Sequence, residues 1–342
     1  MKILIIGPSW VGDMVMSQSL YISLKQQHPD ATIDVMAPAW CRPILERMPE
    51  VDNAIEMPIG HGEFNLKGRY KIGKSLRIEQ YTHAFVLPNS AKSALIPLFA
   101  SIPSRTGWKG ESRYGLLNDI RTNKKNFGLM VERYCALAYE KQSMHNSGSL
   151  PTTPHPKLMV DSESQLRSIK ALGLNQQRPV IGMCPGAEFG PAKRWPDKYF
   201  AQVATEAIQK GYLIWLFGSN KDQAVTEDIQ QQIAPELRQH CFNLAGKTQL
   251  VEVVDLLASC EIVISNDSGL MHIAAAVGTK IIAVYGSTSP DYTPPLSQQL
   301  EIVHTDISCR PCFKRECPYG HLKCLNDLPP SRVIEAVEKL SS

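Results

Sequence analysis

Residues 2–13 read KILIIGPSWVGD, an apolar run followed by a loop with two glycines and an acidic residue. The run from Ile3 to Ile6 is typical of a buried strand, and a Gly-Pro pair ends it. Helical spacing follows at once, because Met16, Leu20 and Leu24 lie on one stripe. A buried strand, a short loop and a helix predict the first unit of an α/β fold.

The same alternation of strand and helix continues along the chain. Further strands are predicted at residues 32–37, 53–57 and 83–88, and amphipathic helical spacing returns around 129–141. A second series of strands, with helices between them, is predicted at 179–184, 212–217, 261–265 and 280–285. Strands that alternate with helices favour parallel sheets with helices on both faces.

Between the two series lies a segment, 143–157, that is rich in Ser, Thr, Pro and Gly and reads as a linker. We therefore predict an α/β protein of two doubly wound Rossmann-like domains that face a central cleft. The predicted parts are residues 1–150, residues 158–328 and a C-terminal helix at 330–342. In such sheets ligands bind beyond the carboxyl ends of the strands, so the loops after the strands hold the functional candidates.

The composition fits two ordinary globular domains. The chain has 342 residues, of which 43% are hydrophobic and 20% charged, and a length of this size favours two cores over one. No apolar run approaches the roughly 20 residues that span a bilayer. The apolar stretch at the N-terminus is too short for a signal-peptide core, so we expect a cytoplasmic protein.

The basic residues are concentrated in the first half of the chain. Residues 1–160 carry 19 Lys and Arg against 13 Asp and Glu, whereas the remainder carries 17 against 20. Much of the excess is at Lys67, Arg69, Lys71, Lys74, Arg77, Lys92, Arg105, Lys109 and Arg113. Such a face suits an anionic partner, which is a phosphorylated glycolipid, an acidic membrane surface or a nucleic acid. The alternative is a solvated surface with a local charge imbalance.

The loop at residues 7–13 is neither a dinucleotide fingerprint nor a P-loop, because G-x-G-x-x-G and Gly-Lys-Ser/Thr are both absent. Asp13 falls in the expected first turn of the following helix. It is either a first-turn acid that favours the helix dipole or a general base that accepts a proton from a substrate hydroxyl.

The second candidate loop, residues 184–196, follows the first strand of the second domain. It delivers Lys193 and Arg194 just before a helix that is expected to begin near Pro196 or Asp197. Adjacent cations at that place suit a phosphate or pyrophosphate. The alternative is an ordinary surface Lys-Arg pair.

The third loop reads SNDSGLMH at residues 265–272. Its small residues let the backbone approach a ligand closely, and the next helix directs its N-terminal amides at the loop. Asp267 is suited to accept hydrogen bonds from sugar hydroxyls. The alternative is a plain helix cap with His272 as a buried histidine. Two more strand-end loops, 218–222 and 286–290, carry further small polar residues.

A cysteine-rich segment, 309–324, contains Cys309, Cys312, Cys317 and Cys324. Four cysteines within so short a segment suit a structural zinc site, and a cytosolic location argues against disulfides. Reduced free thiols and a redox role remain as alternatives. A catalytic zinc is not expected, because four thiolates leave no open position.

Long motifs from residue 1 to about 300 resemble the ADP-heptose:lipopolysaccharide heptosyltransferase family, and within it the heptosyltransferase II group. The motifs are KILIIGPSWVGDMVMSQSL, DVMAPAWCRPILERMPEV, LPNSAKSALIPLFASIPSRTGWKGESRYGLLND, PGAEFGPAKRWP and NDSGLMHIAAAVG. The resemblance implies a GT-B glycosyltransferase that transfers L-glycero-D-manno-heptose, with inversion, from ADP-heptose to the first heptose of the lipopolysaccharide inner core. It also implies that the C-terminal helix crosses back onto the first domain.

The resemblance assigns roles to particular residues. Asp13 matches the family's catalytic base and Lys193 its phosphate-binding lysine, which also acts in catalysis. The donor-binding candidates are Lys193, Arg194, Asp222, Thr248, Asp267, Ser268, Gly269 and His272. The acceptor-binding candidates are Ser9, Trp10, Asn89, Lys92 and Arg113. No D-x-D pair occurs, which favours a metal-independent reaction in which cations and helix dipoles stabilise the departing ADP.

The expected partners are ADP-heptose, a heptosyl-Kdo2-lipid A acceptor and, peripherally, the cytoplasmic surface of the inner membrane. No nucleic-acid signature is present. One alternative is heptosyltransferase I or another core glycosyltransferase of the same fold, and another is a non-catalytic protein that binds a nucleotide sugar. The missing fingerprint argues against an NAD-dependent dehydrogenase.

Overall fold

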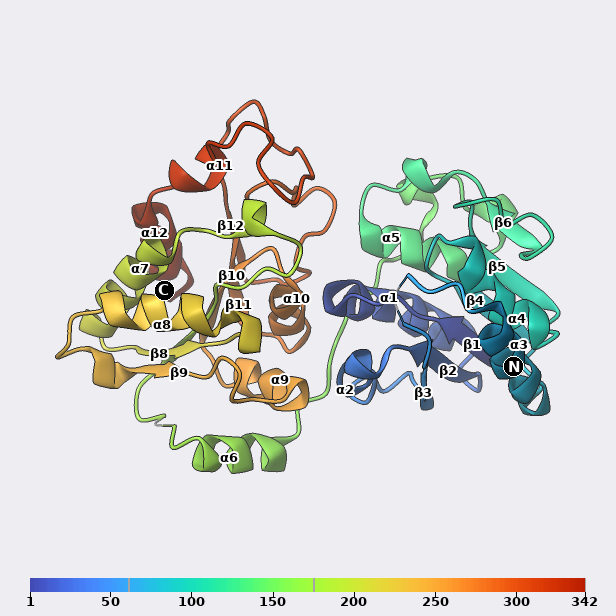
Figure 1. The fold of residues 1–342 in the computed structure, drawn as a ribbon, viewed down its shortest axis with the longest axis horizontal. Coiled ribbons are helices and arrows are strands. Elements are labelled where there is room, and N and C mark those ends of the chain that lie inside the picture. The colour runs from blue at the N-terminus through green and yellow to red at the C-terminus, as the bar shows by residue number, and fades with distance from the viewer. Residues whose placement is uncertain (61, 175, 342) are drawn as a thin grey trace. The chain divides into compact units, whose positions relative to one another are not determined.

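The computed structural model describes residues 1–60, 62–174 and 176–341. The chain folds into two compact units, Met1–Pro156 and Lys157–Ser342 (Figure 1). Each unit is built on a sheet of six parallel strands, which confirms the predicted α/β class with two doubly wound domains. The segment predicted as a linker ends at the boundary, and Asn123 holds its first part on the first unit by donating to the Met144 and His145 carbonyls.

The sheet of the first unit has the strand order β3-β2-β1-β4-β5-β6. Its strands are β1 (Lys2–Ile6), β2 (Thr32–Ala37), β3 (Asn53–Glu56), β4 (His83–Val86), β5 (Ser104–Trp108) and β6 (Asp119–Arg121). The central strands are buried on both faces, which is why they are continuous apolar runs. The order of the strands reverses between β1 and β4, and ligands bind at such a position in doubly wound sheets.

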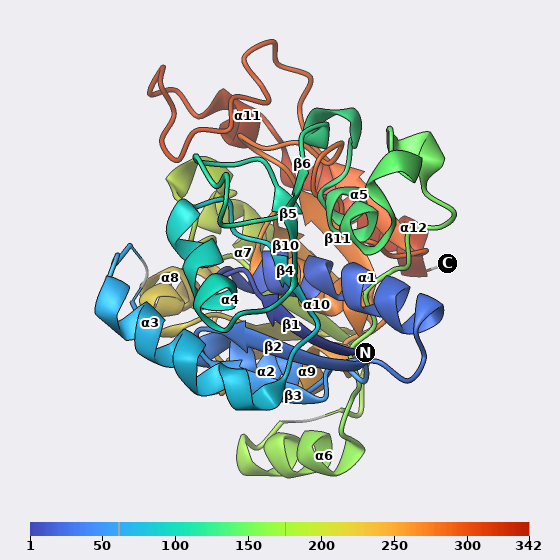
Figure 2. The ribbon, with the colours of Figure 1, turned by 90° about the vertical axis from the view of Figure 1, so that its right-hand side faces the viewer.

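The α-helices described beside this sheet are α1 (Val11–Gln27), α2 (Arg42–Leu45), α3 (Leu66–Ser75), α4 (Leu95–Phe99) and α5 (Met130–Cys135). Helix α1 packs against α5, and α3 packs against α4, which Figure 2 shows beside the sheet. The helix expected around 129–141 is shorter than predicted. It ends at Cys135 and continues only as the 3-10 turn Ala136–Ala138.

The sheet of the second unit has the order β12-β11-β10-β7-β8-β9, which is the same connectivity as in the first. Its strands are β7 (Val180–Cys184), β8 (Leu213–Leu216), β9 (Cys241–Asn243), β10 (Ile262–Asn266), β11 (Lys280–Val284) and β12 (Leu300–Val303). The order reverses between β7 and β10. The loops after these two strands are the ones that the sequence singled out.

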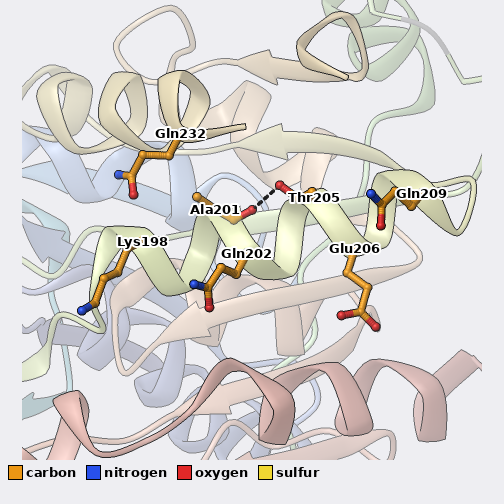
Figure 3. A pocket seen from close by; sticks show the side chains of 7 residues that line it. All are labelled: Lys198, Ala201, Gln202, Thr205, Glu206, Gln209 and Gln232. Carbon is orange, nitrogen blue, oxygen red and sulfur yellow. Dashed lines mark hydrogen bonds between the residues drawn. The ribbon is translucent and has the colours of Figure 1, made fainter. Parts of the chain in front are cut away.

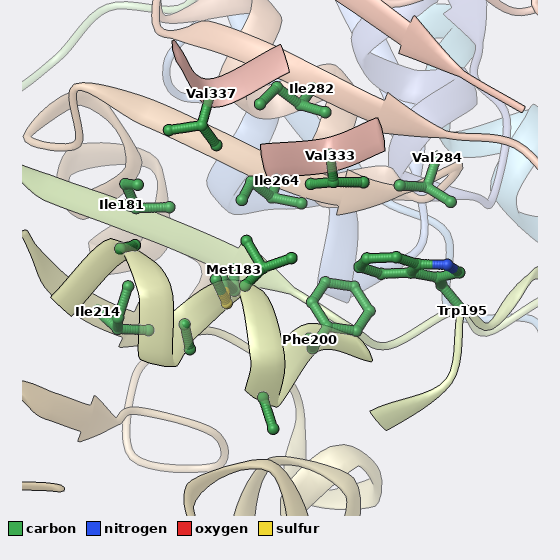
Figure 4. Packing of buried hydrophobic residues seen from close by; sticks show 14 of the residues in the cluster. Ile181, Met183, Trp195, Phe200, Ile214, Ile264, Ile282, Val284, Val333 and Val337 are labelled. Carbon is green, nitrogen blue, oxygen red and sulfur yellow. The ribbon is translucent and has the colours of Figure 1, made fainter. Parts of the chain in front are cut away.

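The helices of the second unit are α6 (Ser162–Ala171), α7 (Asp197–Gln209), α8 (Gln223–Gln232), α9 (Leu250–Ala258), α10 (Gly269–Ala276), α11 (Lys323–Asn326) and α12 (Pro330–Ser341). Figure 4 shows the core on one face of the sheet, where Ile181, Ile264 and Ile282 from three strands pack with Trp195 and Phe200. This core fixes the loop after β7, because Trp195 ends that loop.

The expectation that the C-terminal helix crosses back to the first domain is wrong. Helix α12 belongs to the second unit, where it packs on α7, β11 and β12. Its apolar stripe of Val333, Ala336 and Val337 is buried in the core of that unit. Figure 4 shows Val333 and Val337 there, and burial of a valine side chain contributes about 1.5–3 kcal/mol. Lys280 Nζ also donates to the Leu340 carbonyl at 2.8 Å.

Across the described ranges, none of the helices combines the length and the apolar character needed to cross a bilayer.

Candidate functional site

In the second unit, the carboxylate of Asp267, in the loop after β10, contacts residues of the loops that follow β7 and β11. Lys193 Nζ lies 2.5 Å from Asp267 Oδ2, and the two side chains are only 13% and 4% exposed. Thr288 Oγ1 donates to the same oxygen at 2.6 Å. The structure therefore brings the predicted residues Lys193 and Asp267 together and adds Thr288, from the strand-end loop 286–290, for which the sequence predicted no role.

The surroundings of Lys193 fix the direction of its ammonium group. The ring centroid of Phe189 lies 4.9 Å from Nζ, and a cation over an aromatic face is attracted to it. The sequence suggested that Asp267 binds sugar hydroxyls. In the structure its Oδ2 atom already accepts from Lys193 and Thr288, so Asp267 holds the lysine in place and compensates its charge.

Helix α10 begins directly beside this pair. Ser268 is its N-cap and Gly269 its first residue, and the Ser268 side chain makes no cap hydrogen bond within the described part of the chain. Instead its hydroxyl lies 3.2 Å from that of Ser265. The positive end of the helix dipole and the lysine thus occupy the same loop region, which suits an anion.

His272 lies one turn into α10 and is only 6% exposed. Its pKa is lowered to about 4, mainly by burial, while the Asp267 carboxylate raises it and Lys193 lowers it. The imidazole is therefore neutral near pH 7, as expected for the buried histidine that the sequence left as an alternative.

Asn266 fixes both ends of the loop between β7 and α7. Its Nδ2 donates to the Pro185 carbonyl at 2.7 Å, and its Oδ1 accepts from the Trp195 backbone N–H at 3.1 Å. The residue is fully buried. The signal that could have identified it is a polar residue at the end of an otherwise apolar strand.

The other donor candidates differ in how near they come to this loop. Arg194 Nη2 donates to the Ala187 carbonyl at 3.3 Å, and its Nε is buried without a hydrogen-bond partner among the described residues. Asp222 lies against Gly186, where an added Cβ would come within 2.5 Å of its Oδ1. Thr248 lies farther along the sheet, in the loop after β9, with its hydroxyl 3.5 Å from the Leu244 carbonyl.

In the first unit, Asp13 is the third residue of α1 and is half-buried. Lys124, in the loop after β6, donates from Nζ to Asn89 Oδ1 at 3.2 Å. Burial lowers the pKa of Lys124, Arg133 and Arg113 lower it further, and the Asp13 carboxylate raises it. Asp13, Asn89 and Lys124 therefore belong to one electrostatic group at the carboxyl edge of the sheet.

The remaining acceptor candidates lie in the loops of the same edge. The Ser9 carbonyl accepts from Trp40 Nε1 at 2.8 Å, Trp10 is 44% exposed, and Lys92 is half-buried in the 3-10 turn after β4. Arg113 differs, because it is 1% exposed. Its Nη1 and Nη2 atoms donate to the Pro88 and Trp108 carbonyls. The buried guanidinium therefore links the loops after β4 and β5.

The cysteine-rich segment packs behind the loops of the second unit. Arg310 donates to the Gly286 and Thr288 carbonyls at 3.1 Å. The Phe313 N–H donates to the Ser287 carbonyl at 2.8 Å, and the Arg315 carbonyl accepts from the Ala192 N–H at 3.1 Å. The segment therefore supports the same loops that hold Lys193 and Thr288.

The four cysteines of this segment, together with His321, line one small cavity. Backbone N–H groups, that of Leu322 foremost, lower the pKa of the Cys317 thiol. Among the described residues, however, no group of three or more His, Cys, Asp or Glu side chains is arranged to hold a metal ion. The thiols are gathered but are not positioned as a metal site.

A separate hollow lies on the outside of α7, where Lys198, Gln202, Glu206 and Gln232 line it (Figure 3). It contains none of the candidate residues and is open to solvent. We assign no function to it.

Residues 69–323 match Glycosyltransferase family 9 (heptosyltransferase). The chain belongs to this family. It is 54% identical to lipooligosaccharide heptosyltransferase 2 of Haemophilus influenzae over 99% of both chains. The solved structure of E. coli ADP-heptose LPS heptosyltransferase II matches with a TM-score of 0.90 and 50% identity, over 99% of this chain and 98% of that one.

The same fold occurs in a more distant solved structure. The E. coli heptosyltransferase WaaC with ADP matches with a TM-score of 0.71 at 18% identity, over 99% of this chain and all of that one. These findings confirm the GT-B fold and the glycosyltransferase class that the sequence predicted.

For a family 9 glycosyltransferase, the geometry of the second unit has a direct chemical meaning. A nucleotide diphosphate gains negative charge as its bond to the sugar breaks, and preorganised cations and helix amides stabilise that charge. Lys193 and the first amides of α10 are groups of this kind, and Asp267, Thr288 and Phe189 hold the lysine ready. Lys124 lies outside the motifs, and Asn266 lies within one of them without a predicted role.

Proposed function

We propose that this chain transfers L-glycero-D-manno-heptose from ADP-heptose to the first heptose of the lipopolysaccharide inner core, with inversion and without a divalent metal. The observation that carries the proposal is the ammonium group of Lys193, held by Asp267 and Thr288 beside the first residues of α10. The 54% identity to a lipooligosaccharide heptosyltransferase 2 supports the choice of substrate.

The donor diphosphate binds the second unit. Lys193, with Arg194 beside it, and the amides of Ser268 and Gly269 stabilise the charge on the departing ADP. The WaaC structure, which shares this fold, was solved with ADP, and this supports ADP as the nucleotide. Because His272 is neutral near pH 7, it adds no second positive charge beside Lys193. Asp222 and Thr248 remain candidates for contacts with the nucleoside.

Asp13 acts as the general base on the acceptor hydroxyl. A hydroxyl is a poor nucleophile, and a carboxylate that accepts its proton in the transition state contributes about two to four orders of magnitude in rate. The neighbouring ammonium of Lys124 favours the ionised form of the carboxylate. Ser9, Trp10, Asn89 and Lys92 contact the acceptor, and Arg113 holds their loops in shape.

The acceptor is a heptosyl-Kdo2-lipid A, and the protein reaches it as a peripheral protein on the cytoplasmic face of the inner membrane. The excess of Lys and Arg in the first 160 residues supports an acceptor and a surface that are both anionic.

The first experiment is single-turnover transfer from ADP-heptose to this acceptor in the presence of EDTA, with wild type compared with Asp13→Asn. Asp30→Asn, an exposed change in the same unit, is the matched control. We expect the Asp13 variant to lose about two to four orders of magnitude in rate while its affinity for ADP stays unchanged.

Other outcomes assign the function differently. Transfer only to an acceptor that lacks the first heptose would indicate heptosyltransferase I activity. ADP binding without transfer to any acceptor of a core panel would indicate a binding protein. Normal transfer by Asp13→Asn would leave Asp13 as a helix-dipole residue, and the base would have to be sought elsewhere.

We also propose that the cysteine-rich segment carries a structural zinc ion once its side chains close around it. Cys309, Cys312, Cys317 and Cys324 would hold the ion, and it would stiffen the support of the loop that contains Lys193. Elemental analysis after growth with added zinc tests this. Less than about 0.1 zinc per chain would contradict a tetrahedral cysteine site and leave reduced thiols.

A further inference from the structure

The first unit exposes large apolar side chains at one edge of its sheet. Trp10, Trp40, Phe64, Leu66 and Tyr114 are 44–66% exposed. All five follow the carboxyl ends of β1, β2, β3 or β5. Because these strands are parallel members of one sheet, their carboxyl ends lie along the same edge. We call the five residues the aromatic rim, and such a concentration on a surface marks an interaction site.

Exposed lysines flank the aromatic rim. Lys67, Lys71 and Lys74 recur at helical spacing on α3 and are all exposed. Tyr70, 45% exposed, lies beside this face, and its ring contacts that of Phe99 on α4 at a centroid distance of 5.3 Å. The opposite face of α3 is occupied, because an added Cβ at Gly73 would come within 2.5 Å of Phe99 Cβ on α4. The lysine face of α3 is therefore held toward solvent by its own packing.

The residue types favour a lipid surface over a protein partner. Protein interfaces are depleted in Lys and enriched in Arg, whereas the exposed cations of α3 are lysines. Aromatic residues and lysines together are typical of segments that lie at the membrane interface, where the rings enter the headgroup region and the ammonium groups meet anionic lipid.

We propose that the aromatic rim and the lysine face of α3 dock the first unit onto an anionic lipid bilayer. The inference rests on the proposed function, since an acceptor anchored by lipid A must be met at such a surface. Docking by this edge presents the loops that contain Asp13 and its neighbours to the headgroup layer, where the sugars of the acceptor begin.

The test is co-sedimentation of the full chain with vesicles of phosphatidylcholine alone or mixed with phosphatidylglycerol. We expect binding to the mixed vesicles that weakens with salt. Lys71→Gln should lower the partition coefficient roughly fivefold, whereas Lys170→Gln, an exposed helix lysine of the second unit, should leave it unchanged. Phe64→Ser with Leu66→Ser should weaken binding further by removing the apolar contact.

Transfer assays separate this proposal from the proposed function. With an acceptor stripped of its acyl chains, the Lys71 and Phe64/Leu66 variants should keep the wild-type rate, because none of these residues belongs to the site. With the acceptor embedded in vesicles, they should be slower. An unfolding midpoint temperature equal to that of wild type would show that each variant is folded.

Three outcomes would overturn the docking surface while leaving the enzyme intact. They are transfer without vesicle binding, equal binding by the variants and wild type, and binding of the lysine face to nucleic acid but not to mixed vesicles. Vesicle binding that depends on Lys71 without any transfer would keep the docking surface and contradict the proposed reaction.

Discussion

Lys124 is the residue whose charge the structure couples to Asp13. We predict that Lys124→Gln moves the acidic limb of the kcat/KM profile to higher pH, because removal of a neighbouring cation disfavours the ionised carboxylate. Lys124→Arg should restore the wild-type profile. The pH dependence of transfer between pH 5 and 8 measures the effect.

The neighbouring Lys125 provides the control for this prediction. It is exposed, so Lys125→Gln should leave the limb where it is. A uniform loss of rate at every pH in Lys124→Gln would mean that this lysine acts on the acceptor and not through Asp13.

His272 links the stability of the second unit to pH. Its pKa in the folded protein is about 4, against 6.5 for an ordinary histidine. The unfolded chain therefore binds the extra proton between these values. This contribution to stability is complete above pH 6.5 and is lost as the pH falls toward 4, and it amounts to on the order of 3 kcal/mol.

We predict that His272→Gln flattens the fall in stability between pH 6.5 and 4.5 in urea unfolding. His155→Gln, at an exposed position, should keep the wild-type slope. An unchanged slope in His272→Gln would show that other groups govern the acid sensitivity.

At the residue scale, the sequence indicated which side chains have functional chemistry but not which other side chains they contact. Lys193, Asp267 and His272 stand out because they follow buried strands. Their contact depends on β7 lying next to β10, which neither strand's sequence specifies. The same limit explains why the sequence predicts no role for Thr288 or Lys124. Sequence alone does not distinguish a guanidinium that binds backbone carbonyls, as that of Arg113 does, from one on the surface.

At the element scale, the apolar strands were predictable, and so was the edge strand β3, whereas four other strands were not. β1, β7 and β10 are mostly apolar and almost entirely buried. β5, β6, β9 and β12 show no clear apolar run, because they are short or contain charged and small residues. Partial burial relaxes the apolar pattern that reveals a strand.

The contact between α3 and α4 gives a prediction for Gly73. In a helix, Gly→Ala ordinarily stabilises by about 1 kcal/mol. Here the new Cβ would lie 2.5 Å from Phe99 Cβ and 2.8 Å from the Ile96 carbonyl oxygen. We therefore expect Gly73→Ala to destabilise the protein by about 1–3 kcal/mol, measured by thermal unfolding.

Gly128→Ala is the matched control, because its nearest neighbour would be Glu132 Oε2 at 3.7 Å, an ordinary contact. If Gly73→Ala unfolds at or above the wild-type temperature, α3 is free to move away from α4. The lysine face would then not be held in place.

At the scale of the whole molecule, the alternation of strands and helices was enough to predict two doubly wound units. It could not place the last helix. The amphipathic pattern of Val333, Ala336 and Val337 requires an apolar surface but does not specify which one, and α7 with β11 provides it.

We predict that ADP protects only one unit from hydrogen exchange. Amides at the start of α10 and in the loops after β7 and β11 should exchange more slowly, by up to about a hundredfold when ADP is at a hundred times its dissociation constant. Peptides from the first sheet should be unaffected. Lys193→Met should abolish the protection and Asp13→Asn should keep it. Protection confined to the first unit would refute the assignment of the donor site.

Because α12 stays with the second unit, the backbone passes from one unit to the other a single time, at Pro156–Lys157. The gene can therefore be divided with one cut at this junction, because no later segment of the described chain belongs to the first unit. We expect hybrids that join the first half of one relative to the second half of another to fold from one junction. Such hybrids would allow acceptor preference and nucleotide preference to be inherited, and selected, separately.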